Sequence, residues 1–382
     1  MKILFFTTAP FNMGGPGKWF INLFSELVKR GHEVGVITWG NQGSLMYHCK
    51  NIKIIYDRPI IDLFGFRSLN FLSSIIRAAL IMRKEFKFEI IQTGGIFESF
   101  GTVFGSMKVP VITTLHGDYY TELIPFLQNT PYPRIFKTIY YIMEKIAIKR
   151  TSIFTSPSKW LIERLRERIN PNRICVIPNA IHLPNLREIN EARDKLGLPK
   201  NKKIFVSITN FNSEKRYLAL KMLMDSIKQM NNINQIQIII IGGRNPHGKE
   251  EWIKKIKEYA MSLPIFFIGY KKDILDYLFA ADVVLHPSFL DNHPISILEA
   301  MGCGKPVFAS KVGGIPEIID NEYNGFLLEN DSKEWAAILD RTVKEELNLI
   351  DIGLKAREKI ENNFSWSLII EKYEKIYQSL KI

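Results

Sequence analysis

Cysteine is scarce in this chain of 382 residues, which holds Cys49, Cys175 and Cys303 and no others. Three separated cysteines form neither an even disulfide framework nor a C-x-x-C pair, which favours a reducing, cytosolic compartment. Long apolar runs are also missing: the longest, Leu69–Met82, contains Arg77 and falls short of the roughly 18 residues that a membrane span needs. The N-terminal apolar run has no small-residue cleavage site, so we interpret it as a strand. We therefore expect a cytoplasmic protein.

Metal-binding motifs are absent as well. The sequence holds no D-x-D stretch, no H-E-x-x-H and no cluster of cysteine with histidine. Hydrophobic residues make up 46% of the chain and charged residues 24%, which excludes a disordered or collagen-like protein. A chain of this length forms two or three domains of about 150 residues each. We therefore expect metal-independent chemistry, no cofactor, and domains large enough to bury their own cores.

Positive charge is plentiful but uneven. Of a net charge of +12, residues 1–180 hold 23 lysines and arginines against 12 acids, and residues 181–382 hold 28 against 27. A basic half suggests a polyanionic partner, such as anionic lipid, nucleic acid or an anionic substrate. Lysine and arginine on helices are usually solvated, yet Phe71–Lys87 and Ile135–Arg150 combine cations with apolar bulk, which is typical of helices on anionic membranes. We expect peripheral contact with an anionic membrane and no nucleic acid partner.

Short apolar runs rich in β-branched residues alternate with helical patterns along the chain. In the first half such runs predict seven strands, at Lys2–Thr7, Glu33–Thr38, Ile52–Tyr56, Glu89–Gln92, Pro110–Leu115, Ser152–Thr155 and Ile174–Ile177. In the second half they predict six more, at Ile204–Thr209, Gln237–Ile241, Ile265–Ile268, Val283–His286, Pro306–Ala309 and Phe326–Leu328. The alternation predicts an α/β fold with doubly wound parallel sheets.

Helical periodicity is clearest from Lys18 to Arg30, where apolar residues form one stripe and Gly31 stands at the position of a C-cap. The tail from Ser365 to Leu380 is a second amphipathic helix. Residues 168–199 are rich in asparagine and proline, which indicates a connection between two domains.

The segment Leu285–Leu328 carries the densest chemical signal. A strand ends at His286, a polar loop holding Asp291 follows, and a helix with Pro294 near its start carries Glu299. Acids so placed line the edge of a parallel sheet where doubly wound folds bind ligands. The helix start, and a second helix expected to open at Gly313–Pro316, offer free N–H groups to a diphosphate.

This segment resembles the signature of the retaining glycosyltransferases of family 4 (group 1), which have the GT-B fold. Asp291 and Glu299 fall on the family's two acids, and Ala300, Met301, Cys303, Gly304, Pro306 and Val307 follow in register. The first acid is Asp where the family usually has Glu.

The resemblance extends over essentially the whole chain. Gly14 and Gly15 match a glycine-rich loop after the first strand, and His116 matches a histidine at the end of a strand in the N-terminal domain. In the stretch TNFNSEK, Lys215 matches one residue of a basic pair, whereas Asn210 replaces the usual Arg.

The resemblance implies two Rossmann-like domains facing across a cleft. Residues 1–180 would bind the acceptor, residues 181–364 the nucleotide sugar, and the helix in 365–382 would cross back to the N-terminal domain. The implied activity is retaining transfer of a sugar from a nucleotide diphosphate sugar, a UDP- or GDP-sugar, to a saccharide or lipid-linked acceptor. Surface polysaccharide or glycoconjugate synthesis is the implied setting.

Site roles follow from the same resemblance. Asp291 and His116 would meet the donor sugar, and Lys215 would neutralise the leaving diphosphate beside a weaker hydrogen bond from Asn210. Glu299 would bind the ribose hydroxyls and Tyr270 the base. The remaining substrate-binding positions are Gly14, Gly15, Asn292, His293, Ile295 and Gly314.

Taken singly, these residues have ordinary explanations. His116 alone would be a strand-end histidine, Asp291 a turn residue, and Lys215 a solvated lysine at a helix start. Glu317 is equally well explained as a first-turn acid favoured by the helix dipole. Two other functions stay open: a non-catalytic GT-B relative that acts as a basic membrane or nucleic-acid adaptor, and a nucleotide-sugar 2-epimerase, which the Asp291–Pro306 signature disfavours.

Overall fold

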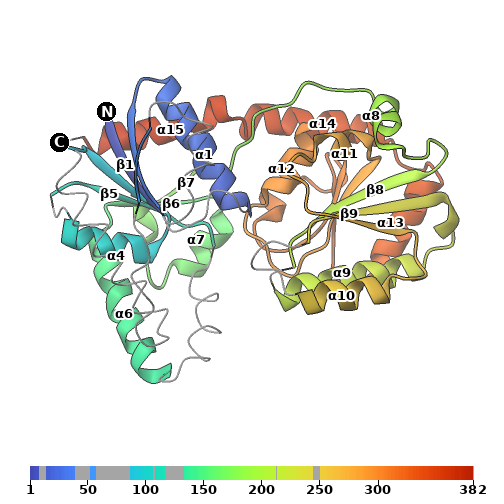
Figure 1. Ribbon diagram of the computed structural model, residues 1–382, viewed down its shortest axis with the longest axis horizontal. Helices are drawn as coiled ribbons and strands as arrows, with labels where there is room; N and C mark the ends of the chain where they lie inside the picture. The colour runs from blue at the N-terminus through green and yellow to red at the C-terminus, as the bar shows by residue number, and fades with distance from the viewer. Residues whose placement is uncertain are drawn as a thin grey trace. The chain divides into compact units, whose positions relative to one another are not determined.

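The computed structural model describes residues 1–7, 14–38, 52–56, 87–105, 108–117, 133–211, 213–243 and 250–381. They form two compact units, one of Met1–Pro178 with Trp366–Ile382 and the other of Asn179–Ser365. Each unit is built on a parallel sheet flanked by helices (Figure 1). The predicted pair of doubly wound α/β domains is confirmed.

The sheet of the first unit has seven parallel strands within the described residues, in the order β3-β2-β1-β4-β5-β6-β7. The first strand therefore lies inside the sheet, as in doubly wound folds. The strands are β1 (Lys2–Thr7), β2 (Glu33–Thr38), β3 (Ile52–Tyr56), β4 (Ile90–Thr93), β5 (Val111–Thr114), β6 (Ile153–Ser156) and β7 (Ile174–Val176). Strands β1, β4 and β5 are buried almost throughout, as expected of parallel strands that are covered on both faces.

Helices cover both faces of this sheet. One face carries α4 (Ile96–Gly105), α6 (Pro133–Arg150) and α7 (Lys159–Leu165), which share one apolar cluster. The other face carries α1 (Gly14–Lys29) and α15 (Trp366–Ser379), which contact each other (Figure 1). A short 3-10 turn, η1 (Pro171–Arg173), precedes β7.

The last helix, α15, is fixed to the first unit by apolar and polar contacts. The ring of Trp366 lies 6.1 Å from that of Trp19 on α1. Glu374 accepts hydrogen bonds from Arg30 at 2.8 Å and pairs with His32 at 2.9 Å. The Tyr377 hydroxyl donates to the Gln92 side chain inside the sheet. These contacts order the end of the chain on a unit that the chain left almost 200 residues earlier.

The sheet of the second unit has six parallel strands within the described residues, in the order β10-β9-β8-β11-β12-β13. They are β8 (Lys203–Ile208), β9 (Ile236–Ile241), β10 (Ile265–Gly269), β11 (Val283–His286), β12 (Val307–Ser310) and β13 (Phe326–Leu328). The sheet is also doubly wound, because strands are added on one side of β8 up to β10 and on the other side from β11 onward.

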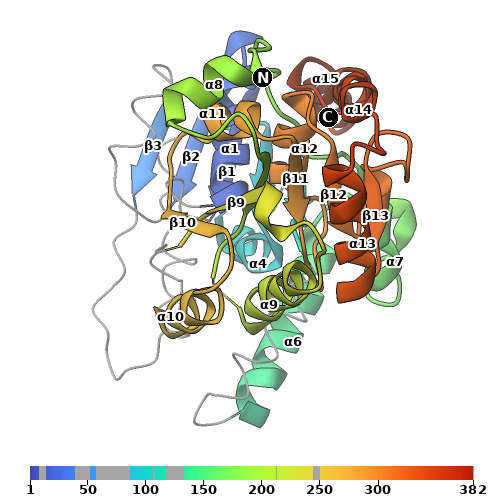
Figure 2. The same ribbon diagram turned by 90° about the vertical axis from the view of Figure 1, so that its right-hand side faces the viewer.

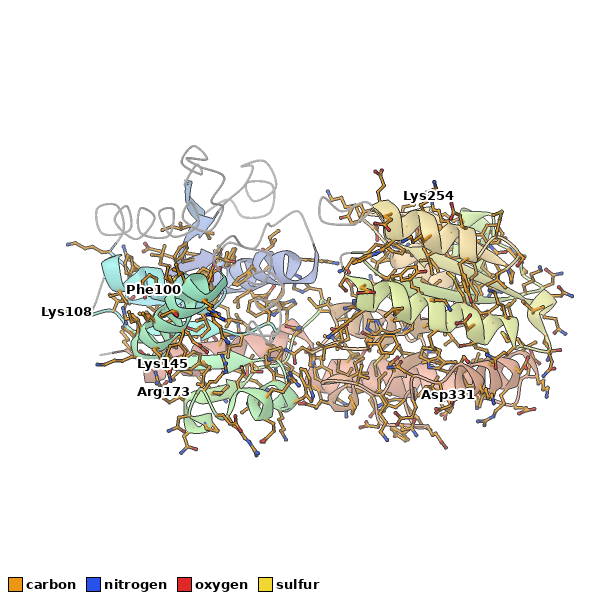
Figure 3. The ribbon with its side chains drawn as sticks, turned by 90° about the horizontal axis from the view of Figure 1, so that it is seen from below. Phe100, Lys108, Lys145, Arg173, Lys254 and Asp331 are labelled. Carbon is orange, nitrogen blue, oxygen red and sulfur yellow. The ribbon has the colours of Figure 1, made fainter. Side chains whose placement is uncertain are left out.

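Two apolar clusters sandwich this second sheet. On one face lie α9 (Glu214–Lys228), α10 (Glu250–Tyr259) and α13 (Ser332–Val343), with α9 and α10 side by side in Figures 1 and 2. On the other face lie α8 (Ile189–Leu196), α11 (Leu275–Ala280), α12 (Ile295–Gly302) and α14 (Leu349–Asn363). Asp331, labelled in Figure 3, caps α13 by accepting from the backbone N–H of Lys333 at 2.6 Å.

The structure finds all thirteen predicted strands, each within one residue of its predicted ends. Two other expectations were wrong. Helix α1 begins at Gly14 rather than Lys18, because the free N–H groups of a first turn tolerate glycine and Pro16. Residues 168–199 do contain the boundary between the two units, at Pro178 and Asn179, and they also contain helix α8.

The second correction concerns the segment after Gly313. It forms η3 (Ile315–Glu317), a single 3-10 turn, and not a helix. Only a few residues separate this turn from the next strand. Asn321 and Gly325 form an isolated bridge, and β13 begins directly afterwards at Phe326. The predicted helix at Phe71–Lys87 lies outside the described residues except for Lys87.

Candidate active site

The predicted donor residues gather at one edge of the second sheet. Strand β8 lies between β9 and β11, and the chain leaves β8 toward α9 but leaves β11 toward α12 on the opposite face. In doubly wound sheets, ligands bind at the carboxyl ends of the strands where the connections diverge in this way. Asn210 and Lys215 lie on the first of these connections, and Asp291 and Glu299 on the second.

Asp291 joins the two connections. Its Oδ2 accepts a hydrogen bond from Arg216 Nη2 at 2.7 Å and lies 3.1 Å from His286 Nε2 at the end of β11. Its Oδ1 accepts from the backbone N–H of Asn292 at 3.0 Å. Arg216 Nη1 also donates to Ser288 Oγ at 3.3 Å. The start of α9 is therefore tied to the loop that precedes α12.

These partners keep Asp291 ionised. Burial by itself raises the pKa of the carboxyl, but the Arg216 guanidinium and the His286 hydrogen bond outweigh burial and hold the pKa well below its ordinary value. A fixed negative charge beside a fixed positive charge suits a site that binds a polar, charged ligand.

The glycine pair after β12, Gly313 and Gly314, contacts the backbone of the Asp291 loop. The backbone N–H of Gly314 donates to the carbonyl oxygen of Asp291 at 3.1 Å. Gly313 has a φ of +60°, and a Cβ there would lie 1.7 Å from that same carbonyl oxygen. Only glycine permits this backbone approach. The predicted Gly314 therefore contacts the site through its backbone.

The loop into α12 holds the next three predicted residues. Asn292 and His293 are buried, and Ile295 is half-buried at the first position of the helix, with Pro294 as its N-cap. The carbonyl oxygen of His293 accepts from Asn179 Nδ2 at 2.7 Å. Burial lowers the pKa of His293 to about 4 despite the nearby charge of Asp291, so its ring is neutral at pH 7. Glu299 is half-buried on α12.

The connection after β8 places Lys215 and Arg216 differently. Helix α9 begins with Ser213 as its N-cap, and Lys215 stands exposed in its first turn. Within the described part of the chain Lys215 forms no ion pair, whereas Arg216 pairs with Asp291. The Asn210 side chain is half-buried, and its Oδ1 accepts no hydrogen bond from the residues described.

Tyr270 lies farther along the same edge, just after β10. Its side chain is 59% exposed. Gly242, at the end of β9, donates its N–H to the carbonyl oxygen of Gly269, next to Tyr270. The backbone N–H of Thr209, after β8, donates to the carbonyl oxygen of Ile241. The ends of β8, β9 and β10 are therefore adjacent. The position of Tyr270 is compatible with an open binding surface.

The first unit holds the other three predicted residues. His116 follows β5 by two residues, and its ring lies 4.8 Å from Trp19 and 5.4 Å from Phe20, both on α1. Burial lowers its pKa to about 4, so the ring is neutral at pH 7. Gly14 and Gly15 form the first turn of α1.

Sequence reasoning missed Arg216, His286 and Ser288 as neighbours of Asp291. Arg216 carried a signal, because it directly follows Lys215 in a segment already chosen for its cations. His286 is the last residue of its strand and therefore faces the loop that holds Asp291. The contact itself joins residues 75 positions apart, which no local pattern reveals.

Comparison with known families covers both units. Residues 13–184 match the family described as Glycosyltransferase Family 4, and residues 188–364 match Glycosyl transferases group 1. This chain belongs to the group 1 glycosyltransferases of family 4. The residues matched by the group 1 family include the whole Asp291 site and both of its connections.

Two curated glycosyltransferases align with most of this family 4 chain. The N-acetyl-alpha-D-glucosaminyl L-malate synthase of Bacillus anthracis is 24% identical, with 99% of this chain and 97% of the relative aligned. The UDP-Gal:alpha-D-GlcNAc-diphosphoundecaprenol alpha-1,3-galactosyltransferase of Escherichia coli is 25% identical, with 86% and 81% aligned.

Among solved structures, HepE of Anabaena in complex with UDP has a TM-score of 0.79 at 20% identity, covering 99% of this chain and all of that one. This likeness identifies the fold of the glycosyltransferase as GT-B. No helix among its described residues is both long and apolar enough to cross a membrane. The described residues also contain no group of three or more histidine, cysteine or acidic side chains arranged to hold a metal ion.

Proposed function

We propose that this glycosyltransferase moves a hexosyl group from a nucleotide diphosphate sugar to a saccharide or lipid-linked acceptor in surface polysaccharide or glycoconjugate synthesis. The second unit would bind the donor and the first unit the acceptor. One observation carries the proposal: Arg216 and the ionised Asp291 meet across the point where the connections of β8 and β11 diverge. Lys215 stands exposed in the adjacent turn.

The chemistry follows from these charges. The bond between sugar C1 and the β-phosphate oxygen breaks, a bond from C1 to an acceptor hydroxyl oxygen forms, and the hydroxyl proton passes to the leaving phosphate. Negative charge builds up on the diphosphate, so fixed cations and helix N–H groups aimed at it lower the barrier. Lys215, Arg216 and the first turn of α9 supply both. We propose that they act without a divalent cation and that the anomeric configuration is retained.

The comparisons support a uridine donor first. HepE of Anabaena was solved with UDP and also with UDP-glucose. The galactosyltransferase of Escherichia coli is named for a UDP-Gal donor and a diphosphoundecaprenol-linked acceptor. A UDP-hexose with a lipid-linked acceptor is therefore the first pair to test, and a GDP-sugar is the alternative donor.

The test is nucleotide release from a panel of UDP-, GDP- and ADP-sugars, with and without chelator. We expect one donor class to be turned over. We also expect Glu299→Ala and Lys215→Ala each to lower turnover about a hundredfold, as the loss of an oriented electrostatic group does. Glu258→Ala and Lys333→Ala are matched controls, because they remove exposed residues of the same charge. Both should keep wild-type turnover.

Three results would contradict parts of this account. Absence of both release and nucleotide binding with every donor would favour the non-catalytic adaptor. Conversion of the nucleotide sugar to an epimer without transfer would favour a 2-epimerase. Wild-type turnover in both Glu299→Ala and Lys215→Ala would remove the site assignment while leaving the activity in place.

We further propose that the first unit contacts an anionic membrane through α6. This helix buries one apolar stripe, formed by Tyr140, Met143 and Ala147, yet exposes a second. The second stripe consists of Ile135, Ile139, Ile142 and Ile146, which are 37–58% exposed and recur at helical spacing. Lys145, labelled in Figure 3, lies over the exposed Tyr141 ring at 5.3 Å. An exposed apolar stripe flanked by lysines suits the interface of an anionic bilayer.

Sedimentation with phosphatidylglycerol and phosphatidylcholine vesicles tests the membrane contact. Wild-type protein should pellet with the anionic vesicles, and the double variant Ile139→Glu with Ile142→Glu should lose most of that binding. Leu354→Glu alters an exposed leucine on α14, which is 58% exposed, and should bind like wild type. Equal pelleting of the double variant and wild type would contradict the proposal.

A further inference from the structure

Charge at the donor site is balanced by an arginine that the family pattern does not provide. The predicted site residues on the two connections at the β8–β11 edge include two acids, Asp291 and Glu299, and one cation, Lys215, to which the structure adds Arg216. Without Arg216, the two acids would outnumber the one remaining cation, which disfavours an anionic ligand. An ionised Asp291 that had lost its guanidinium partner would also repel a diphosphate at short range.

We propose that Arg216 is the second cation for the donor diphosphate, held in place by Asp291 and taking the role that Asn210 cannot fill. This inference rests on the proposed function, since it assigns a residue to the diphosphate of that donor. It also explains how a carboxylate remains ionised beside an anionic ligand: the Arg216 guanidinium would lie between the two negative groups and reduce the repulsion between them.

The position of Arg216 suits this role. It is the third residue of α9 and lies in the first turn, where the backbone N–H groups have no partner within the helix. Its own N–H donates to Ser213 Oγ at 3.4 Å. Its side chain is 22% exposed, so the guanidinium is fixed without being sealed off. Arg216 donates from Nη1 to Ser288 and from Nη2 to Asp291. A guanidinium carries five N–H donors in a planar fork, which leaves donors for phosphate oxygens while Asp291 is held.

A purely structural role makes a different prediction. If Arg216 only anchored the Asp291 loop, its loss would lower the binding affinity of every ligand that contacts the loop to a similar degree. If it contacts the diphosphate, its loss would weaken a nucleoside diphosphate far more than the matching monophosphate. The comparison of UDP with UMP separates these roles, because the two differ by the β-phosphate alone.

The experiment is calorimetric titration of UDP and UMP into wild-type, Arg216→Gln, Arg216→Lys and Arg216→Gln/Asp291→Asn proteins at low salt. We expect Arg216→Gln to weaken UDP about 10- to 100-fold, the range for a lost charge-assisted hydrogen bond. UMP should change by less than about threefold. Arg216→Lys should retain part of the UDP affinity. The double variant should bind UDP more tightly than Arg216→Gln, because the uncompensated carboxylate is gone.

Arg187→Gln is the matched control. Arg187 forms an ion pair of 2.6 Å with Asp276 in the same unit, and neither residue belongs to the two connections, so its loss should leave UDP affinity unchanged. If Arg216→Gln lowered the affinities for UDP and UMP equally, or lowered neither, the proposed role of Arg216 would be overturned. Binding of UDP by the wild-type protein would still support the donor site. Failure of the wild-type protein to bind UDP, GDP or ADP would overturn the proposed function and this inference together.

Discussion

His293 shows how the site constrains single residues. It is buried beside an ionised carboxylate, yet its ring stays neutral because burial lowers its pKa by more than the charge of Asp291 raises it. Its Nδ1 has no hydrogen-bond partner among the described residues. Its ring lies 5.4 Å from that of Phe364, so it packs as an aromatic group. Such a histidine positions the loop through its backbone and shape rather than by transferring a proton.

Stability should therefore depend on pH through His293. Its pKa is about 4 in the folded chain and 6.5 when unfolded, so between these values the unfolded state binds more protons. The free energy of unfolding should fall as pH drops from 6.5 to 4, by about 3 kcal/mol for this residue, and then level off. Urea unfolding of wild type and His293→Gln across this range measures the difference. Parallel curves for the two proteins would contradict the prediction.

At the scale of elements, turns at the sheet edge decide where the acids lie. The Gly313 turn after β12 touches the carbonyl oxygen of Asp291. Asp291 itself carries the side-chain contact to α9. A change in the turn should therefore be transmitted to the donor site although the turn holds no charged group.

Gly313→Ala tests this link. We expect a loss of about 2 kcal/mol or more in the free energy of unfolding, from the left-handed backbone and the overlap with Asp291, together with weaker UDP binding. Gly197→Ala is a close control, since Gly197 has a φ of +64° but nothing within 4 Å of a Cβ. It should lose about 1 kcal/mol and keep UDP binding. Equal UDP affinity in both variants would contradict the link.

The elements themselves were largely predictable. Parallel strands buried on both faces are commonly near-continuous apolar runs, and β8, β9 and β11 were predicted directly from such runs. Helix α8 was missed because it is short and polar, although Gly197 at its C-cap was an available signal. Asp291 and Glu299 were proposed as site acids from their spacing and the family resemblance, and the structure shows the contacts of Asp291 with Arg216 and His286. Arg216 was not predicted, because its role depends on the distance between two connections rather than on neighbours in sequence.

At the scale of the whole chain, α15 ties the C-terminus to the first unit. Trp366 and Tyr373 bury their rings against Trp19, and Tyr377 reaches Gln92 inside the sheet. We therefore expect the first unit to depend for its stability on α15, which follows the second unit in the chain.

Trp366→Ala should measure this dependence. We expect a loss of about 3–5 kcal/mol in the unfolding free energy of the first unit, the range for a fully buried aromatic residue. Leu368→Ala, two residues along the same helix at a site that is 38% exposed, should cost less than about 1 kcal/mol. Urea unfolding followed by tryptophan fluorescence provides the measurement. Similar losses in both variants would show that α15 is not packed as described.

The central claim is that the second unit holds a nucleotide diphosphate where the connections of β8 and β11 diverge. A crystal structure of the chain with UDP tests it most directly. The account predicts both phosphates at the start of α9, with oxygens within about 3 Å of the Arg216 guanidinium and the Lys215 ammonium reaching the same group. UDP bound with its phosphates elsewhere, or out of hydrogen-bond reach of both cations, would contradict the account.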